Sequence, residues 1–556
     1  MYSIFAPRPA PWYSAFITAL ALALSPVSAA GEPVAESQCP GLTTIFDPAE
    51  VPEAAKEIYR RHGFGLIWSD CGAPNLQAHA IRSAILHAAE EGLSPGDYDG
   101  FQSLWADQGV LKYPAAFDLA LTGAALAFLR DLAGGRVAPR VADPHWSIER
   151  TVPSATALLG SVLTAESPAE RIAAIAPEHR DYLQLRSALS RYRAIAAAGG
   201  WPILETGPVI GEGDRDFRIR FLRERLAAEG DLGAGPPALD PERFDAELSS
   251  ALRRYQQRHG LDADGRLGDR TVAELNVSAE ARAAQIERSM ERWRWMPRFL
   301  GPRYILVNIP AFRLQLIENG TPVVESRVIV GQPNRPTPRI KAEASGLLLN
   351  PSWTIPPTIL REDVLPKLRR DPGWLAERNM HVFIGWGPDA RELDPALIDW
   401  RTASAERFPY VIRQDPGSAN ALGRLKVEMP NSAGVYLHDT PDKKLFELTN
   451  RAKSSGCVRI DRIMDLAVAL LGEGWNSNRL ESLIGSGTTS MLPLRGPVPV
   501  YLAYFPAWVD GAGVPHFSPD IYGLDLPLEH AFDAKSAPAG FEEAMACASD
   551  QDPGLD

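Results

Sequence analysis

The residues with the clearest chemical potential lie between His438 and Cys457. Residues 454 to 459 read Ser-Ser-Gly-Cys-Val-Arg, and His438 lies 457 − 438 = 19 positions before the cysteine. A thiol is a good nucleophile only as a thiolate, and a free cysteine with a pKa of about 8.5 is mostly protonated at neutral pH. An imidazole within hydrogen-bond reach can take that proton. The pattern predicts Cys457 as a nucleophile and His438 as its general base.

The sequence around Cys457 also predicts how the thiol is positioned. Gly456 permits a tight turn, and residues 462–471 have the apolar spacing of a helix. The N-terminus of a helix offers free N–H groups and positive potential, which favour a thiolate and can bind an oxyanion. We therefore expect Cys457 in a turn just before this helix, and His438 at the end of a strand.

Two charged neighbours have plausible roles. Asp439 could orient the imidazole of His438 through its backbone carbonyl or through its carboxylate, and the sequence leaves both open. Arg459 has the forked guanidinium that binds a substrate carboxylate in a bidentate manner. An ordinary surface ion pair is the alternative for Arg459.

Three further cysteines bear on this hypothesis. Cys39 and Cys71 could form a disulfide that closes a loop of 71 − 39 = 32 residues. In an exported protein such a loop contributes about 3–4 kcal/mol to stability. A Cys457–Cys547 disulfide is the alternative to a free nucleophile, although Cys547 lies in a tail whose Ala, Asp, Gly and Pro content is typical of disorder.

Composition limits the class of protein. A chain of 556 residues predicts three or four domains at roughly 150 residues each. Charged residues make up 23% and hydrophobic ones 45%, which is typical of globular proteins. The net charge of −12 disfavours nucleic acid as a partner. The histidines at 62, 79, 87 and 145 lack metal-ligand spacing, so we expect no metal site and read them as packing or surface residues.

The first thirty residues have the features of a secretory signal peptide. Arg8 precedes an apolar run from Trp12 to Leu24, Pro26 would end a helix, and Val27 to Ala30 supply small residues for cleavage. The apolar run is short for a membrane span, which needs about 20 residues. We expect export to the periplasm, with an uncleaved anchor as the alternative.

The first two hundred residues have a helical pattern. Apolar residues recur at helical spacing after Asn75 until Gly92, and a second Ala/Leu-rich stretch covers Phe117 to Leu132. We expect a helical scaffold domain here.

Residues 206–278 form a compact unit. Helices are expected over residues 217–229 and 246–259, and a third begins at Thr271 after the Asp264-Gly265 turn. The string from 251 to 276 resembles the three-helix peptidoglycan-binding module. Its matching positions include Tyr255, Gln256, Gly260, Gly265 and Leu275, which are mainly turn glycines and core residues. They would be needed even if the module bound nothing.

A period of two begins at Tyr304 and predicts strands. They are expected over 304–309, 312–316, 328–330, 350–355, 435–438 and 500–505 and from Leu425, with a hairpin turn at Asn319-Gly320. A helical stretch over 359–370 is followed by a loop-rich section that contains Trp374, Trp386 and Trp400. These tryptophans form either a small core, which we favour, or a wall that contacts a peptide.

Several motifs in this region resemble the L,D-transpeptidase catalytic domain of the YkuD fold, and more closely the larger YcbB-type enzymes. The matches are Val-Gly-Gln-Pro-Asn-Arg-Pro-Thr-Pro (330–338), Asn-Pro-Ser-Trp-Thr-Ile-Pro-Pro (350–357), Asn-Ala-Leu-Gly-Arg (420–424) and Tyr-Leu-His-Asp-Thr-Pro (436–441), together with residues 307–312. Most of that family has His directly before Gly-Cys and Asn after Cys-X. This chain has Ser455 and Arg459 at those positions, as in the YcbB-type variant, which leaves His438 as the sole candidate base.

The resemblance implies a multidomain α+β protein. We expect a signal peptide over 1–30, a helical scaffold domain over 31–204, a peptidoglycan-binding-like module over 205–278 and a connecting helix over 279–300. A β-rich catalytic domain would cover 301–510, with a capping subdomain inserted at 359–424. Residues 511–556 would form a C-terminal segment and flexible tail.

The resemblance also implies the chemistry. Cys457 would attack the peptide bond between meso-diaminopimelate and the terminal D-alanine of a tetrapeptide stem, with the N–H groups around Gly456 and Cys457 as the oxyanion hole. The acyl group would pass to the side-chain amine of a second diaminopimelate. Substrate contacts are expected from Arg459, Ser455, Tyr436, Trp353 and Asn420. No cofactor is expected, and carbapenems are expected to acylate Cys457.

Two other functions remain open from the sequence. A periplasmic cysteine hydrolase would use the same nucleophile and base but transfer the acyl group to water. A non-catalytic scaffold would bind the cell wall through residues 206–278, with Cys457 inert.

Overall fold

The computed structural model describes residues 46–47, 51–70, 72–105, 110–233 and 238–536. The expected signal peptide and three of the four cysteines, Cys39, Cys71 and Cys547, lie outside these residues, so the Cys39–Cys71 disulfide stays a prediction. No described helix is long and apolar enough to cross a membrane.

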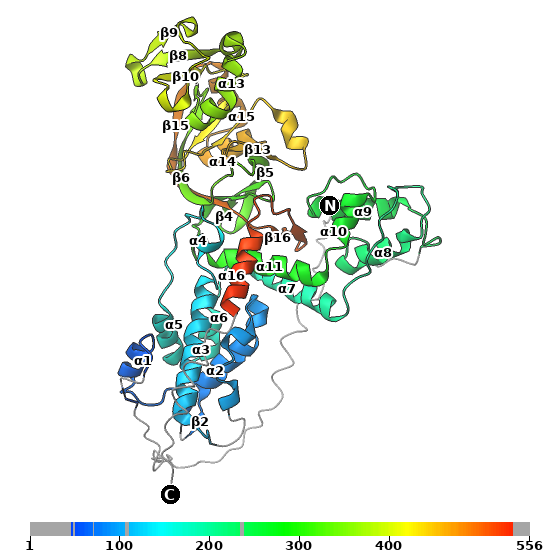
Figure 1. The fold of residues 1–556 in the computed structure, drawn as a ribbon, viewed down its shortest axis with the longest axis vertical. Helices are drawn as coiled ribbons and strands as arrows, with labels where there is room; N and C mark the ends of the chain where they lie inside the picture. The colour runs from blue at the N-terminus through cyan, green and yellow to red at the C-terminus, as the bar shows by residue number, and fades with distance from the viewer. Residues whose placement is uncertain (1–45, 48–50, 71, 106–109, 234–237, 537–556) are drawn as a thin grey trace, which may run out of the picture. The chain divides into compact units, whose positions relative to one another are not determined.

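The N-terminal region is helical, as predicted. Its helices are α1 (Lys56–Arg61), α2 (Leu76–Leu86), α3 (Pro114–Gly134), α4 (Pro139–Ala142), α5 (Ala155–Leu163), α6 (Pro168–Ala173) and α7 (Arg180–Ala197), and a hairpin joins β1 (Ser69–Asp70) to β2 (Ala73–Pro74). Helices α2, α3, α5 and α6 lie side by side (Figure 1). The Asn75 side chain caps α2 by accepting the N–H of Ala78, which is why the helix begins there.

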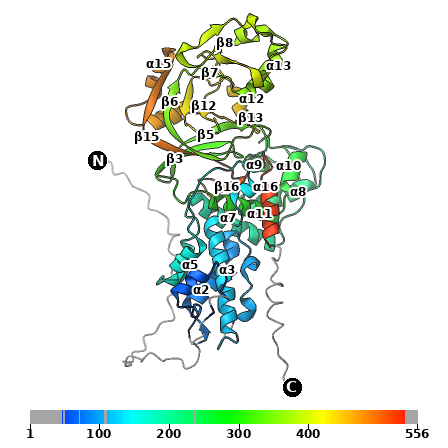
Figure 2. The ribbon, with the colours of Figure 1, turned by 60° about the vertical axis from the view of Figure 1, so that its left-hand side comes forward.

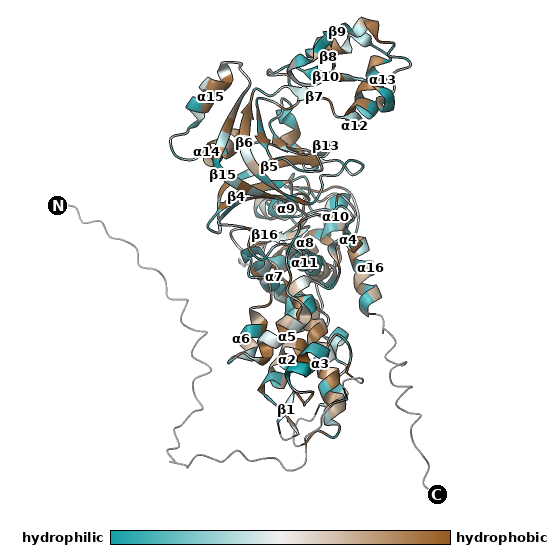
Figure 3. Cartoon of the chain, turned by 90° about the vertical axis from the view of Figure 1, so that its left-hand side faces the viewer, coloured by the Kyte–Doolittle hydropathy of each residue, from teal (hydrophilic) through white to brown (hydrophobic). Residues whose placement is uncertain are grey.

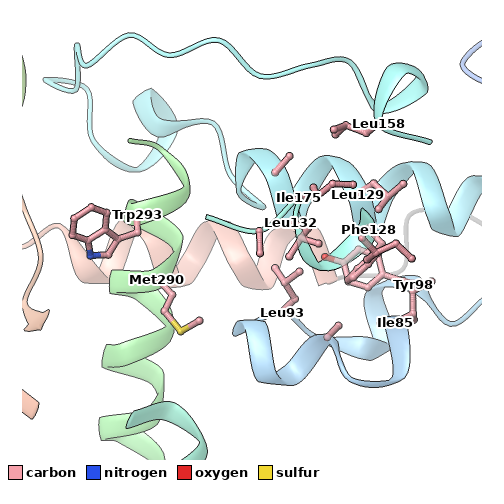
Figure 4. Close-up of a cluster of buried hydrophobic side chains, with 14 of the residues drawn as sticks. Ile85, Leu93, Tyr98, Phe128, Leu129, Leu132, Leu158, Ile175, Met290 and Trp293 are labelled. Atoms are coloured by element: carbon pink, nitrogen blue, oxygen red, sulfur yellow. The ribbon is translucent and has the colours of Figure 1, made fainter. Parts of the chain in front are cut away.

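The apolar face of α3 forms the centre of this region. Phe128, Leu129 and Leu132 are at most 2% exposed and pack against residues of the neighbouring helices (Figure 4). Met290 and Trp293 of α11 (Ala279–Arg294) belong to the same cluster. The helix that we predicted as a connection is therefore part of the scaffold core.

The three-helix module has its own core. It contains α8 (Arg218–Glu229), α9 (Ala246–Arg258) and α10 (Asp269–Leu275), with buried residues such as Leu222 and Leu252 between them. The amide of Gln256 accepts from the N–H of Gly265 at 2.8 Å and donates to the Asp264 carboxylate at 2.8 Å. These motif residues thus build the turn before α10, where Gly265 has a positive φ of 72°.

A nine-stranded sheet forms the β-rich part. Its strands are β3 (Arg303–Asn308), β4 (Arg313–Glu318), β5 (Thr321–Gly331), β6 (Ile340–Leu349), β11 (Leu425–Glu428), β12 (Leu437–His438), β13 (Ala452–Ser454), β14 (Val458–Ile460) and β15 (Ser490–Ala503). The order is β13-β5-β14-β12-β11-β6-β15-β3-β4, and β4 also pairs with β5, so that the sheet closes on itself. Figure 2 shows β5, β6 and β12 among the strands of this sheet. Hydrophobic residues follow β5 and β6 in Figure 3.

Two helices pack against the sheet. Helix α14 (Ile463–Leu471) buries Ile463, Leu466 and Leu470 against it, and α15 (Ser477–Gly485) contributes Leu480 and Ile484. Strand β6 and helix α15 are not among the elements that we predicted.

The inserted capping subdomain is more regular than predicted. A second, four-stranded sheet has the order β7-β10-β8-β9, formed by β7 (Trp353–Thr354), β10 (Tyr410–Gln414), β8 (Met380–Ile384) and β9 (Arg391–Leu393). The helical stretch contains α12 (Pro357–Ile359), the π-helix η4 (Leu360–Val364) and α13 (Leu365–Leu368). The section predicted to be rich in loops also contains β8, β9 and β10, which have only three to five residues each and leave little periodicity in the sequence. We call residues 353–414 the cap.

The cap has a separate hydrophobic cluster. Leu368, Val382 and Trp400 are at most 4% exposed within it, and Trp374 packs against it. Trp386 is 75% exposed and belongs to neither a core nor a wall. The preferred reading of the tryptophans as core residues is therefore right for Trp400 and wrong for Trp386, while Trp374 both packs against the core and lines the cavity that contains Cys457.

The C-terminal segment is folded as far as residue 536. A hairpin joins β16 (Ala507–Val509) to β17 (Pro515–Phe517), and α16 (Asp525–Ser536) follows. Leu528 is fully buried in the scaffold core, which explains why this part of the expected tail is ordered.

The separate core of the cap gives a stability prediction. Leu368 is fully buried there, so Leu368→Ala should destabilise the cap by about 2–5 kcal/mol. Hydrogen exchange should become faster over residues 353–414 and stay unchanged in β6 and β15. Leu397, which is 74% exposed in the same subdomain, provides the control Leu397→Ala. If Leu368→Ala increased hydrogen exchange in the nine-stranded sheet as much as in the cap, the separation of the two cores would be contradicted.

Candidate active site

The pairing of β12 with β14 brings the predicted nucleophile and base to neighbouring strands. The strands are parallel, with Leu437 opposite Val458 and His438 opposite Arg459, and the N–H of Val458 donates to the carbonyl of Tyr436 at 3.0 Å. Side chains alternate between the two faces of a strand. Tyr436, His438, Cys457 and Arg459 therefore share one face of the sheet.

These side chains line one cavity of about 1000 Å³. Its described lining includes Trp353, Tyr436, His438, Ser455, Cys457 and Arg459. Cys457 is partly buried and is a free cysteine among the described residues, whereas Cys547, its alternative disulfide partner, lies outside them. The site therefore has a thiol, an imidazole and a guanidinium around a space that can hold a peptide.

The nucleophile turn, residues 454–457, is fixed by buried hydrogen bonds. The Ser454 hydroxyl donates to the Cys457 carbonyl at 2.5 Å and accepts the N–H of Gly456 at 3.2 Å. The carbonyl of Gly456 accepts from the hydroxyl of Thr337 at 2.8 Å. Gly456 has a φ of 112°, which strains any residue with a side chain, so a glycine is required.

The prediction that Cys457 lies in a turn just before a helix was wrong. Strand β14 separates Cys457 from α14, which begins at Ile463. The helix N-terminus therefore does not activate the thiol. The N–H of Gly456 is already bonded to Ser454, so the N–H of Cys457 itself is the better candidate for an oxyanion donor.

His438 ends β12, as predicted, and is 4% exposed. Burial, together with the positive charge of Arg459, lowers the pKa of His438 to about 3, although the backbone carbonyls of Asp439 and Leu422 act in the opposite direction. The ring is therefore neutral at physiological pH. Its Nδ1 atom has no hydrogen-bond partner among the described residues, which leaves it able to accept a proton.

Burial raises the pKa of the Cys457 thiol. The backbone and hydroxyl of Tyr436 and the charges of Lys426 and Arg459 act against that rise. The ring of Tyr436 lies 4.4 Å from the Lys426 ammonium and 5.6 Å from the His438 ring. At rest the cavity thus holds a neutral thiol and a neutral imidazole, and the Tyr436 hydroxyl contacts the thiol.

Asp439 does not orient the imidazole through its carboxylate. Its carboxylate oxygens accept from the Arg424 N–H at 2.9 Å and from the Lys443 ammonium at 2.6 Å. The backbone of Asp439 acts to raise the pKa of His438. Of the two roles left open by the sequence, the structure favours the carbonyl.

Two arginines of the cavity differ in how fully they are paired. Arg335 donates to Glu362, to Asp363 and to the hydroxyl of Ser455, so its guanidinium is occupied. Arg459 reaches only Thr440 at 3.5 Å and Asp442 at 3.6 Å, and its Nε atom is unpaired among the described residues. Arg459 thus forms a long ion pair with Asp442, as the surface-pair alternative predicted, but its guanidinium is less fully paired than that of Arg335, and Ser455 is bonded to Arg335.

Trp353 and Asn420, which we also predicted to contact substrate, lie in different surroundings. Trp353 lines the cavity beside Tyr436. Asn420 lies apart from the described lining: it is 1% exposed, its amide donates to the Asp415 carbonyl and its oxygen accepts from the Leu422 N–H. Asn420 thus stabilises the loop before β11.

Sequence reasoning missed several residues of the site. Lys426, Arg335 and Thr337 reach the nucleophile turn or its neighbours from other strands and loops. Lys426 lies opposite His438 in the antiparallel pair of β11 and β12, so only the register reveals it. No group of three His, Cys, Asp or Glu side chains among the described residues is arranged to hold a metal ion.

The contact between Tyr436 and Cys457 gives a prediction on reactivity. Tyr436→Phe removes a hydroxyl that lowers the pKa of Cys457, so the pH profile of iodoacetamide alkylation should move up by about one pH unit. Mass spectrometry of the Cys457 peptide measures the rate. Neither profile should show a step near pH 6.5, because His438 is already neutral there. Tyr410→Phe, in the cap, is the control, and an unchanged Tyr436→Phe profile would contradict the assignment.

Three family models match the chain. The model described as "L,D-transpeptidase catalytic domain" (YkuD) matches residues 302–477, which include His438 and Cys457. The model described as "Scaffold domain" matches residues 53–189, and the one described as "Putative peptidoglycan binding domain" matches residues 217–275. The three matches follow the order of the folded regions described above.

A curated relative supports the catalytic match. It is a protein of Haemophilus influenzae (strain ATCC 51907 / DSM 11121 / KW20 / Rd) described as "Putative L,D-transpeptidase", which is 40% identical over 259 residues. The alignment covers 46% of this chain and 51% of the relative, so the chain spans about half the length of the curated relative that it matches.

Solved structures are more distant. An L,D-transpeptidase (Yku) from Stackebrandtia nassauensis is 13% identical, with 53% of this chain and 96% of that chain covered and a TM-score of 0.22. An L,D-transpeptidase (residues 123-326) from Xylanimonas cellulosilytica DSM 15894 is 15% identical, with 54% and 99% covered and a TM-score of 0.18. Both TM-scores are low, so the family assignment depends on the sequence matches alone. On those matches, the chain carries a YkuD-type L,D-transpeptidase catalytic domain together with a scaffold domain and a peptidoglycan-binding domain.

Proposed function

We propose that this protein is a periplasmic L,D-transpeptidase that forms direct crosslinks between diaminopimelate residues of peptidoglycan. The observation that carries the proposal is the placement of Cys457 and His438 on one face of paired strands, in one cavity, with the imidazole neutral and its Nδ1 atom unpaired. The match to the catalytic domain supports the same chemistry. The peptidoglycan-binding domain supports a cell-wall substrate.

In the first half of the reaction, substrate binding brings a stem tetrapeptide against Cys457. The thiol gives its proton to His438, and the thiolate attacks the carbonyl carbon of the bond between meso-diaminopimelate and the terminal D-alanine. The N–H of Cys457 binds the oxyanion that forms. When the C–N bond breaks, His438 returns the proton to the leaving D-alanine amine, and a thioester remains on Cys457.

In the second half, the side-chain amine of a neighbouring diaminopimelate attacks the thioester. His438 takes a proton from this amine, the C–S bond breaks, and the thiolate of Cys457 regains the proton. The product is an amide between two diaminopimelate residues. Attack by water instead would release a tripeptide, so the hydrolase alternative differs only in the acceptor.

The assay that tests this function uses a disaccharide tetrapeptide and the protein from the periplasmic fraction, whose recovery there also tests the proposed export. Wild type should release D-alanine and form crosslinked dimers. Cys457→Ala should do neither, because no nucleophile remains, and His438→Gln should be about 10²–10⁴-fold slower. Intact-mass spectra should show a carbapenem adduct on wild type and none on Cys457→Ala. Release of tripeptide without crosslinked dimer would identify a hydrolase. If neither product nor carbapenem adduct formed, binding of the cell wall would be the remaining function.

The incompletely paired guanidinium of Arg459 predicts an effect on substrate binding. Arg459→Lys keeps the charge but loses bidentate donation to a stem carboxylate, so KM for the tetrapeptide should rise roughly 10–100-fold, with a smaller change in kcat. Arg462→Lys is the matched control, because Arg462 lies on the same segment but pairs with Asp465 at the exposed surface. Equal KM values for Arg459→Lys and Arg462→Lys would show that Arg459 is only a structural residue.

A further inference from the structure

A loop of the scaffold domain reaches the catalytic domain next to the nucleophile turn. This scaffold loop, residues 143–147, follows α4, and Trp146 forms a parallel β-bridge with Arg339 at the start of β6. The N–H of Ser147 donates to the carbonyl of Arg339 at 2.8 Å. The contact is thus made by backbone as well as by side chains.

A buried ion pair lies at the centre of this contact. The guanidinium of Arg339 is bidentate on the Asp143 carboxylate, with Nε donating to Oδ2 at 2.5 Å and Nη2 donating to Oδ1. Arg339 is 1% exposed and Asp143 is 3% exposed. A charge left alone in such a place is strongly unfavourable. Each partner therefore fixes the position of the other.

The pair continues by hydrogen bonds to the nucleophile turn. The third nitrogen of the guanidinium, Nη1, donates to the carbonyl of Thr337 at 3.0 Å. Thr337 is fully buried, and its hydroxyl donates to the carbonyl of Gly456 at 2.8 Å while it accepts the N–H of Gly331 at 2.8 Å. One unbroken chain of contacts thus runs from Asp143 to the residue before Cys457.

The C-terminal segment holds the same threonine from another side. The hydroxyl of Tyr522 accepts the N–H of Thr337 at 3.0 Å and donates to the carbonyl of Gly331 at 2.7 Å. Thr337 can therefore shift only if several buried hydrogen bonds change together, which makes it a rigid link between Arg339 and Gly456.

We propose that the scaffold loop positions the catalytic nucleophile, with Asp143, Arg339 and Thr337 as positioning residues that set the placement of Cys457. This inference rests on the proposed function, because it assigns the scaffold domain a part in the same reaction. The three residues act through the Gly456 carbonyl and touch no substrate.

An independent observation places the scaffold loop at the site. His145 lies among the residues that line the catalytic cavity, and its backbone N–H donates to the Asp143 carboxylate at 3.1 Å. The loop that holds Arg339 therefore also supplies part of the cavity wall. Without the scaffold domain the catalytic site lacks that wall and one support of its nucleophile turn.

The test compares four variants of the full chain with wild type. Asp143→Asn removes the charge at nearly constant shape, and Thr337→Val removes the hydroxyl that bonds Gly456, while Thr337→Ser retains it. Asp118→Asn is the control: Asp118 is fully buried in the scaffold and accepts from Tyr59 and from the N–H groups of Ile67 and Trp68, away from the catalytic domain. For each variant we would measure kcat, KM, the melting temperature and the alkylation rate of Cys457.

Asp143→Asn and Thr337→Val should lower kcat about 10–100-fold per folded molecule, because a nucleophile misplaced by about 1 Å can cost that much. KM should stay within about twofold, because the carboxylate-binding groups are unchanged. Alkylation of Cys457 should become faster, since the freed turn is more accessible to a small reagent. Thr337→Ser should restore kcat, and Asp118→Asn should lower the melting temperature with kcat and alkylation unchanged.

A kcat of Asp143→Asn within twofold of wild type would overturn the inference, as would an equal loss in Asp118→Asn. If wild type shows no turnover, the proposed function fails, and the alkylation rates alone decide the positioning role. Equal alkylation in wild type, Asp143→Asn and Thr337→Val would then refute it.

Discussion

The parallel pairing of β12 with β14 is the constraint on which the site depends. Two residues 19 positions apart come together only because Leu437 lies opposite Val458, which fixes Cys457 and His438 on the same face. A shift of the register by one residue would turn one of them away from the cavity. The closed order of the sheet and the bonds of Ser454 and Thr337 to the turn all maintain this register.

Burial sets the protonation states of the catalytic pair. It raises the pKa of the Cys457 thiol and lowers the pKa of His438 to about 3, so both groups are neutral at rest. An ion pair of thiolate and imidazolium is not the stable state of the free site. In the proposed reaction the thiolate would therefore form only once substrate is bound, and the Tyr436 hydroxyl and the charge of Lys426, which act to lower the pKa of Cys457, would stabilise it.

Elements with local signals could be predicted from the sequence, whereas those fixed by distant contacts could not. Asn75 caps α2, and Asn319-Gly320 forms the hairpin turn with two positive φ angles. Strands β13 and β14 have three residues each, too few to show a period. Cys457 and His438 were predicted because their chemistry is visible in one segment. The bond from Thr337 to Gly456 joins residues 119 positions apart, and no local pattern indicates it.

The separate core of the cap has a consequence for how this architecture can vary. The chain enters the cap at β7 and leaves it after β10, and the cluster around Leu368 and Val382 is distinct from that of the nine-stranded sheet. Substitutions, insertions or an exchange of the whole unit can therefore be accommodated there without repacking the strands that carry Cys457. Evolution can therefore remodel this part of the cavity lining while the packing of the nine-stranded sheet stays the same, provided that the contacts of Arg335 with Glu362 and Asp363 are kept.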